Sequence, residues 1–190
     1  FDDNDALLYF NKRALDIVNN KLKNKRKPIQ WDEMFTKYQA NISAQETTIQ
    51  VWHGADLIGS VVNAGYNGIF SPNADWYLDH LATAWQTMYM EEPSAFVSNT
   101  SNEDLLLGGE GCMWGETVDV SDIEQTIWPR MAAIAERLWS PRDVNDTKAA
   151  EPRYAYFRCL LNQRGIEAAP YNNSAARQPP NMPGSCYLQR

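Results

Sequence analysis

The sequence has few of the features that mark nucleic-acid binding or membrane insertion. Its 190 residues carry 17 Lys and Arg against 24 Asp and Glu, a formal net charge of −7, and an acidic chain is a poor partner for nucleic acid. The one basic cluster, residues 21–27, is interpreted as the solvated last turn of a helix, where cations suit the helix dipole. No apolar run approaches the ~20 residues of a membrane span. We therefore expect neither nucleic acid nor a membrane-spanning segment.

Cofactor and thiol signatures are also missing. Neither a GxGxxG nor a P-loop motif occurs. Of the three cysteines, Cys112 lies in a glycine-rich turn and is expected to be a small buried group, because His53 and His80 show no signature of a Cys–His pair. We expect no cofactor and no metal ion.

Some features indicate a secretory route. The chain starts at Phe1 without a signal-like segment, so we interpret it as a processed product or part of a longer protein. Four glycosylation sequons lie in polar connecting stretches. Their asparagines are Asn41, Asn99, Asn145 and Asn172. Cys159 and Cys186 bracket a loop rich in Pro, Asn and Gly, where a disulfide would tie down the tail.

The most informative stretch is residues 109–117, GEGCMWGET. It follows Leu105–Leu107, which predicts a short buried strand. Its three glycines allow a sharp turn from which Trp114 and Glu116 emerge. An indole beside a carboxylate at the end of a strand is a common way to hold a sugar. The aromatic face takes the C–H side of the ring, and the carboxylate accepts hydrogen bonds from hydroxyls.

The same pattern occurs three more times upstream. The predicted strands are residues 29–30, 48–51 and 68–70. The polar and aromatic residues that follow them include Trp31, Asp32, Glu33, Trp52, His53, Trp76, Tyr77 and Asp79. A single such ending is ordinary for a core tryptophan, but four successive ones indicate a binding surface.

Helix-like periodicity separates these strands. Helices are expected at residues 4–24, 55–64, 78–89, 126–139 and 151–164, with a polar loop at 93–104 and a turn-rich tail beyond Pro170. Alternating strands and helices predict parallel strands with right-handed crossovers. An open doubly wound sheet and half of a (β/α)₈ barrel both fit. Functional side chains at four successive strand ends favour the barrel, and its remaining strands must lie before Phe1.

Several of these motifs together resemble the C-terminal half of the family 20 β-N-acetylhexosaminidases, closest to the eukaryotic lysosomal and secreted type. The matching segments are residues 31–33, 51–52, 76–79, 108–116, 128–130 and 135–140. The resemblance implies strands five to eight of a (β/α)₈ TIM barrel, with residues 1–170 as barrel and 171–190 as a disulfide-tied tail. Cys159 and Cys186 match the family's C-terminal disulfide.

The resemblance also implies a mechanism. The enzyme would release terminal β-linked N-acetylglucosamine and N-acetylgalactosamine with retention, the sugar's own acetamido oxygen acting as the nucleophile. Trp31, Trp52 and Trp114 would wall the acetamido pocket, and Tyr77 would donate a hydrogen bond to the attacking oxygen. Two carboxylates, Asp79 and Glu116, would bind the C4 and C6 hydroxyls.

The family's adjacent Asp-Glu pair, including its general acid, and its sugar-gripping Arg are absent from these 190 residues. Glu33 matches the strand-five tryptophan motif, so we read it as a binding or supporting residue. The chain alone is therefore expected to be inactive and to need the upstream half of the same protein. The resemblance implies that the intact enzyme is lysosomal or extracellular and forms a homo- or heterodimer. Two alternatives stay open: a non-catalytic sugar-binding protein on this fold, and a two-carboxylate barrel glycosidase that uses Glu33 and Glu116.

Overall fold

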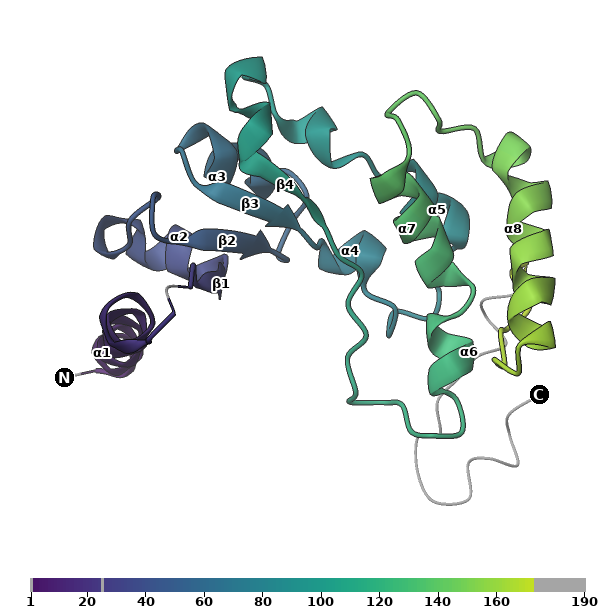
Figure 1. Cartoon of the computed structure of the whole chain (residues 1–190), viewed down its shortest axis with the longest axis horizontal. Coiled ribbons are helices and arrows are strands. Elements are labelled where there is room, and N and C mark those ends of the chain that lie inside the picture. Colours follow the sequence, from purple (N-terminus) through teal and green to yellow (C-terminus); the bar gives the residue numbers. More distant parts are fainter. Residues whose placement is uncertain (1, 25, 173–190) are drawn as a thin grey trace. The chain divides into compact units, whose positions relative to one another are not determined.

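The computed structural model describes residues 2–24 and 26–172 (Figure 1). The chain falls into two compact units. Unit 1 is made of residues 1–70 and 93–108, and unit 2 of residues 71–92 and 109–190. The sheet belongs to unit 1, whereas the described part of unit 2 is mainly helical.

Unit 1 contains a four-stranded sheet with strands in the order β1-β2-β3-β4. The strands are β1 (Ile29–Trp31), β2 (Thr48–Val51), β3 (Asn67–Phe70) and β4 (Leu106–Gly109). The pairs β1–β2 and β2–β3 are parallel, with Ile29 opposite Thr48 and Thr48 opposite Asn67. This confirms the predicted α/β class, because parallel neighbours require crossover connections.

Helices and helical turns precede and separate these strands. They are α1 (Asp3–Asp16), the π-helical turn η1 (Ile17–Lys21), α2 (Glu33–Tyr38), α3 (Leu57–Asn63) and the 3₁₀ turns η2 (Gln39–Asn41), η3 (Pro93–Phe96) and η4 (Thr100–Leu105). The α3 helix stops where Gly65 adopts a positive φ of 86°, as its position in the sequence predicts. Ile49, Val51 and Phe70 from the sheet and Ile58 from α3 are fully buried and form the core.

Unit 2 is a set of helices around two buried tryptophans. Its helices are α4 (Asn73–Trp76), α5 (Trp85–Met90), α6 (Ile123–Ile127), α7 (Arg130–Trp139) and α8 (Thr147–Gln163). Trp76 and Trp85 are 0% and 2% exposed. The Trp85 ring stacks on Tyr154 of α8 with a centroid distance of 4.4 Å, which packs α8 against α5.

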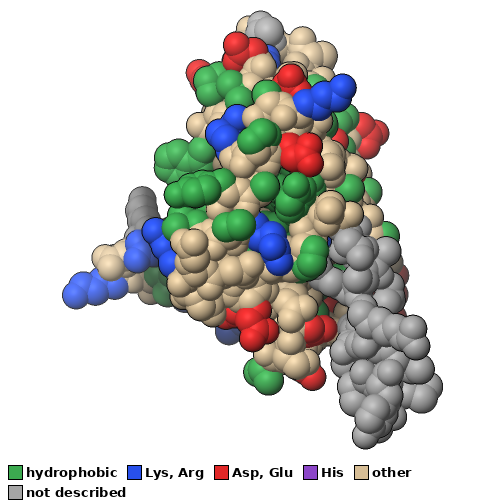
Figure 2. Space-filling view, turned by 90° about the vertical axis from the view of Figure 1, so that its right-hand side faces the viewer, with side chains coloured by type: hydrophobic (Ala, Val, Ile, Leu, Met, Phe, Trp, Pro, Cys, Tyr) green, Lys and Arg blue, Asp and Glu red, His purple; other side chains and the backbone are tan. Residues whose placement is uncertain are grey.

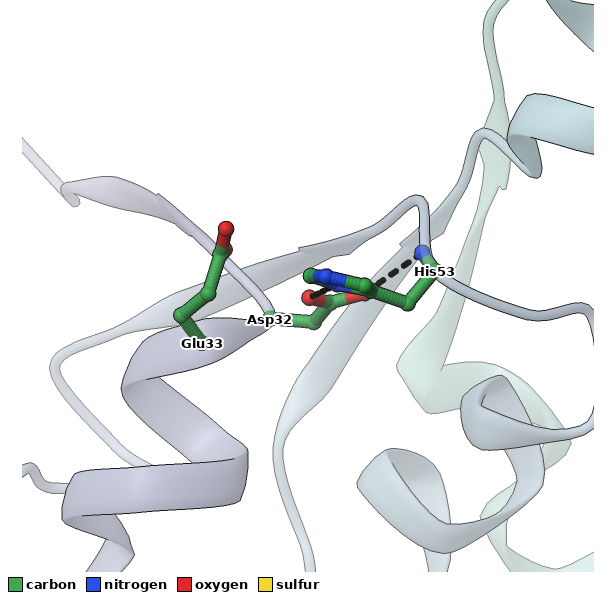
Figure 3. Close-up of side chains that lie close together, drawn as sticks. All are labelled: Asp32, Glu33 and His53. Atoms are coloured by element: carbon green, nitrogen blue, oxygen red, sulfur yellow. Dashed lines mark hydrogen bonds and ion pairs between the residues drawn. The ribbon is translucent and has the colours of Figure 1, made fainter.

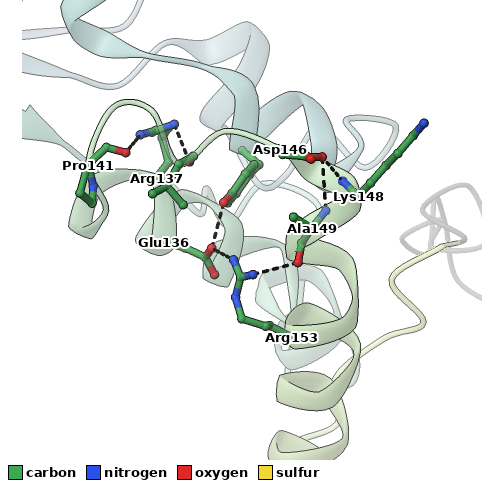
Figure 4. A network of polar contacts seen from close by, with 9 residues as sticks. Glu136, Arg137, Pro141, Asp146, Lys148, Ala149 and Arg153 are labelled. Carbon is green, nitrogen blue, oxygen red and sulfur yellow. Dashed lines mark hydrogen bonds and ion pairs between the residues drawn. The ribbon is translucent and has the colours of Figure 1, made fainter.

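A polar network joins α5, α7 and α8 (Figure 4). Glu136 of α7 accepts a hydrogen bond from the Tyr89 hydroxyl at 2.9 Å and pairs with Arg153 of α8. At the start of α8, Asp146 accepts from the N–H groups of Lys148 and Ala149. The cap and the cross-helix contacts fix where α8 begins.

A groove of about 410 Å³ lies between α7 and α8, lined mainly by apolar side chains. Its lining includes Trp128, Ala132, Phe157 and Leu160, with Glu136 and Arg153 at its edge. Figure 2 shows the face on which α8 lies, where hydrophobic side chains gather among charged ones. Among the described residues, none of the helices is long and apolar enough to cross a lipid bilayer.

Four local predictions were wrong. The helix expected from residue 78 begins only at Trp85, and the expected loop at 93–104 holds two 3₁₀ turns. The single helix expected at 126–139 is broken at Trp128 and Pro129, because a residue before proline avoids the α conformation and proline has no N–H. Leu107 was expected in a buried strand but is 56% exposed.

The boundary of one more helix was also wrong. The last helix begins at Thr147 and not at Glu151, since the Asp146 cap adds its first turn. Pro152 therefore stands inside α8 and not in its first turn.

Candidate functional site

In unit 1, two predicted site tryptophans stand at neighbouring strand ends. Trp31 is the last residue of β1 and pairs with Gln50, two residues before Trp52. Trp31 is 37% exposed and Trp52 is partly buried. Parallel pairing brings the C-terminal ends of β1 and β2 to the same edge of the sheet, so the residues that follow the two strands meet there.

Three side chains surround Trp52 (Figure 3 shows these three). The Asp32 carboxylate, 0% exposed, accepts from the backbone N–H of Trp52 at 2.8 Å and of His53 at 3.0 Å. Its other oxygen lies 2.6 Å from Nδ1 of His53. Glu33 accepts from Nε1 of the Trp52 indole at 3.3 Å, and the His53 ring centroid lies 3.8 Å from that of Trp52. Trp52 is thus held at its backbone, ring edge and ring face.

In unit 2, Tyr77 and the glycine-rich stretch are joined by backbone pairing. Tyr77 forms an isolated parallel bridge with Cys112. The bridge brings the Tyr77 ring to a centroid distance of 5.7 Å from Trp114 and the two planes to 57°. Tyr77 is 7% exposed and Trp114 is 36% exposed, so the pair presents one buried and one accessible aromatic ring.

The two predicted hydroxyl-binding carboxylates of unit 2 have different surroundings. Oδ1 of Asp79 is buried and has no hydrogen-bond partner among the described residues, whereas Oδ2 lies 3.9 Å from Nε2 of His80. A buried carboxylate oxygen without a partner carries a free-energy cost that an incoming hydroxyl would relieve. Glu116 is exposed.

Arg130 was not predicted as a site residue, although it falls in one of the matching segments. It is 2% exposed and donates hydrogen bonds to the carbonyl oxygens of Leu78, His80, Thr83 and Thr126. Three of these acceptors belong to the loop that carries Asp79. The guanidinium therefore shapes that loop, an arrangement visible only once the fold brings residues 50 positions apart together.

Cys112 is buried, as the sequence predicts. Its Sγ lies 3.2 Å from the Ser71 hydroxyl. Burial raises the pKa of the Cys112 thiol above its usual value, which disfavours the nucleophilic thiolate.

The predicted modification sites are on the surface where the structure describes them. Asn41, Asn99, Asn145 and Asn172 are all exposed. Cys159 is exposed on α8. The expected disulfide involves Cys186, which lies outside the described residues.

One group of described side chains could hold a metal ion. Ligand atoms of Asp32, Glu33 and His53 lie within 4.8 Å of one another. The Asp32 oxygens already accept from two backbone N–H groups and contact the His53 ring, so the carboxylate has a structural use without an ion.

The structure thus brings Trp52 together with Glu33 in unit 1, and Tyr77 with Trp114 in unit 2. Trp31, Trp52 and Glu33 belong to unit 1, and Tyr77, Asp79, Trp114 and Glu116 to unit 2.

Comparison with known proteins gives a consistent family match. The model of the glycosyl hydrolase family 20 catalytic domain matches residues 2–142. β-Hexosaminidase 1 of Arabidopsis thaliana is 46% identical over 193 aligned residues, covering 100% of this chain and 35% of that protein. β-Hexosaminidase subunit B2 of Dictyostelium discoideum is 35% identical, covering 96% of this chain and 32% of that protein. The chain thus spans about a third of the length of these relatives.

Solved structures show the same fold. A chitobiase of Flavobacterium johnsoniae aligns with a TM-score of 0.74 at 24% identity, over 87% of this chain and 25% of that chain. A β-N-acetylhexosaminidase of Streptomyces coelicolor aligns with a TM-score of 0.70 at 20% identity, over 89% of this chain and 38% of that chain. With the parallel sheet, these alignments confirm that the chain is a fragment of a (β/α)₈ barrel.

Proposed function

Because the chain belongs to glycosyl hydrolase family 20, we propose that it forms part of an exo-β-N-acetylhexosaminidase that removes terminal, non-reducing N-acetylglucosamine and N-acetylgalactosamine from glycoconjugates. The observation that carries the proposal is the Tyr77–Trp114 pair of unit 2, with a buried oxygen of Asp79, two residues after Tyr77, that has no hydrogen-bond partner within residues 2–24 and 26–172. A phenol donor, an aromatic face and a carboxylate acceptor are the groups that recognition of an N-acetylated sugar requires.

The residues divide by the part of the sugar they bind. Trp31, Trp52 and Trp114 enclose the acetamido methyl group and exclude water from it. Tyr77 donates its hydroxyl hydrogen to the acetamido oxygen. Asp79 and Glu116 accept from the C4 and C6 hydroxyls, with Asp79 supplying the buried oxygen for which the described part of the chain offers no partner.

In the reaction, the acetamido oxygen attacks the anomeric carbon as the glycosidic bond breaks. The leaving oxygen takes a proton from a general acid outside these 190 residues, and a cyclic oxazolinium ion forms. Water then adds to the same carbon and reopens the ring with net retention. Tyr77 contributes by holding the oxygen in near-attack geometry, and the apolar walls strengthen that hydrogen bond by excluding water.

The proposal extends to the intact protein. Residues 1–170 are taken as barrel and 171–190 as a tail tied by Cys159 and Cys186, and the catalytic Asp-Glu pair lies in an upstream half that this chain does not contain. The exposure of all four sequon asparagines is compatible with glycosylation and supports passage through the secretory pathway to a lysosomal or extracellular location. Relatives named as subunits support a homo- or heterodimer.

The proposal is tested with the intact enzyme and two chromogenic substrates that differ only at C2. The N-acetyl-β-glucosaminide should be hydrolysed, and the β-glucoside, which lacks the acetamide nucleophile, should not. A stable thiazoline analogue of the oxazolinium ion should inhibit. Equal turnover of both substrates would replace the substrate-assisted mechanism with the two-carboxylate alternative. Binding of N-acetylglucosamine without any turnover would indicate a sugar-binding protein.

A further inference from the structure

We propose that Asp32, Glu33 and His53 form a clamp that sets the position of the Trp52 ring, so that the acidic dipeptide acts in positioning and not in acid–base or metal chemistry. We call these three side chains the Trp52 clamp. The inference rests on the proposed function, since it gives the clamp's purpose as shaping one wall of the acetamido pocket.

The backbone of Trp52 is held by a buried side chain. The fully buried Asp32 carboxylate accepts the N–H groups of two successive residues, Trp52 and His53, at 2.8 and 3.0 Å. Because Asp32 follows β1 and Trp52 follows β2, these bonds lock together the two turns that leave the sheet.

The ring of Trp52 is fixed separately from its backbone. The indole Nε1–H donates to Glu33 at 3.3 Å, and the His53 imidazole lies against the ring at a centroid distance of 3.8 Å and a plane angle of 37°. His53 is in turn held by Asp32 at 2.6 Å (Figure 3). An edge contact and a face contact together restrict both side-chain torsions of a tryptophan.

The contacts of Asp32 conflict with two other kinds of chemistry at this cluster. A general acid must reach the leaving oxygen of the substrate, whereas Asp32 is 0% exposed and its oxygens contact the 52–53 turn. A cation bound between the three residues would have to displace the 2.6 Å contact between Asp32 and His53. The clamp accounts for the four contacts described above between these three side chains and Trp52 or His53.

The decisive variants are Glu33→Gln and Glu33→Leu in the intact enzyme. Glutamine keeps a side-chain oxygen that accepts from the indole N–H, whereas leucine removes the acceptor at similar size. We expect Glu33→Gln to keep kcat/KM within about threefold and Glu33→Leu to lower it about 10–100-fold, since a small misplacement of a reacting group can cost roughly 10² in rate. Glu46→Leu, at an exposed glutamate of the same unit, is the matched control.

The activities of the two Glu33 variants could overturn the clamp in either of two ways. An equal, large loss in Glu33→Gln and Glu33→Leu would mean that the charge or proton of Glu33 matters, and wild-type activity in both would mean that the contact is incidental. In a Trp52→Phe background, Glu33→Leu should have little further effect, because the clamp acts through the indole. An ion site would be shown instead if a chelator abolished the activity of the wild-type enzyme, Zn²⁺ restored it, and neither treatment changed the activity of Glu33→Leu.

A readout independent of turnover separates the clamp from the proposed function. In enzyme labelled with 5-fluorotryptophan, the ¹⁹F signal that disappears in Trp52→Phe belongs to Trp52. It should shift or broaden in Glu33→Leu and stay in place in Glu33→Gln and Glu46→Leu. An unmoved signal in Glu33→Leu refutes the clamp. The expected shift in a protein that hydrolyses no N-acetylhexosaminide would uphold the clamp and refute the enzyme function.

Discussion

Tyr77 pairs with Cys112 in a parallel β-bridge, through two hydrogen bonds made by the residues on either side of Tyr77. Cys112 N–H donates to the Trp76 carbonyl at 3.1 Å, and Leu78 N–H donates to the Cys112 carbonyl at 2.8 Å. The bridge sets the segment bearing Trp114 beside the segment bearing Tyr77 and Asp79. One pair of hydrogen bonds therefore positions three of the proposed sugar contacts in unit 2.

If Tyr77 orients the nucleophile, Tyr77→Phe in the intact enzyme should lower kcat by on the order of 10²–10³, as loss of one oxyanion-hole donor does. The melting temperature should change little, because the ring volume stays the same. Tyr66→Phe is the control, since the Tyr66 hydroxyl donates to the Ile42 carbonyl at 3.0 Å and serves structure. A lower melting temperature with unchanged kcat would assign Tyr77 to the core.

Asp79 should make the enzyme discriminate against a 6-sulfate. Like charges brought together at a desolvated interface cost roughly several kcal/mol, so kcat/KM for the 6-sulfated substrate should be at least about tenfold below that of the neutral one. Asp79→Asn should narrow this ratio. Both substrates are compared at acidic and neutral pH. Equal turnover of the two substrates at both pH values would contradict the assignment.

Expressed alone, residues 1–190 should not hydrolyse a chromogenic N-acetyl-β-glucosaminide. A general acid contributes typically 10²–10⁴-fold to the rate, and the strands β1 and β4 end the sheet with unpaired edges, which invite aggregation. Co-expression with the upstream half should restore solubility and activity. If the purified chain hydrolysed the substrate and Glu33→Gln abolished this activity, the general acid would have to be assigned to Glu33.

Glu91→Gln should stabilise the protein at neutral pH but not in acid. Burial, followed by repulsion from Asp75, raises the pKa of Glu91 above its usual value. A raised carboxyl pKa means that the folded state holds the proton more tightly, so stability falls as pH rises from the unfolded pKa through the folded one. The gain at pH 7 should be about 1–2 °C and vanish below the ordinary glutamate pKa. Thermal melts across pH test this, with the exposed Asp143→Asn as control; a gain independent of pH would refute it.

Arg130→Met should destabilise the protein strongly. It removes donors from four carbonyls, and each buried polar group left unpaired costs about 1–3 kcal/mol. We expect a loss of about 3–5 kcal/mol in denaturant unfolding, against almost none for the exposed Arg164→Met. A loss below about 1 kcal/mol would show that solvent replaces the guanidinium at these carbonyls.

Local patterns in the sequence predicted the elements that depend on local chemistry. The four strands and α3 with its glycine stop follow from apolar runs and a residue that tolerates positive φ. The segment from Leu78 to Ala84 was wrongly predicted as helix from its apolar spacing. Three of its carbonyls accept hydrogen bonds from Arg130, which lies 47 to 52 positions away, and the spacing does not reveal this contact. Long-range side-chain contacts of this kind are invisible to a periodicity argument.

The candidate site shows the same limit. Trp52 can be chosen from the sequence because it directly follows a predicted strand, and Tyr77 because it lies in the aromatic and acidic segment that follows the next one. That Glu33 bonds the indole and Asp32 the backbone follows only from the pairing of β1 with β2, which sets residue 32 beside residue 52. The exposure of Leu107 was missed because an apolar run does not reveal which strand ends the sheet.

The interleaved composition of the two units has a consequence for anyone dividing the chain. Unit 1 takes residues 1–70 and 93–108, while unit 2 takes 71–92 and everything from 109. No single cut yields both units whole. A break after Phe70 leaves η3 and β4 of unit 1 on the piece that carries unit 2, and a break after Gly108 leaves α4 and α5 of unit 2 on the piece that carries unit 1. A two-piece version of this protein would therefore reassemble only if a segment of one piece packed into a unit that the other piece also helps to form, whichever loop is opened.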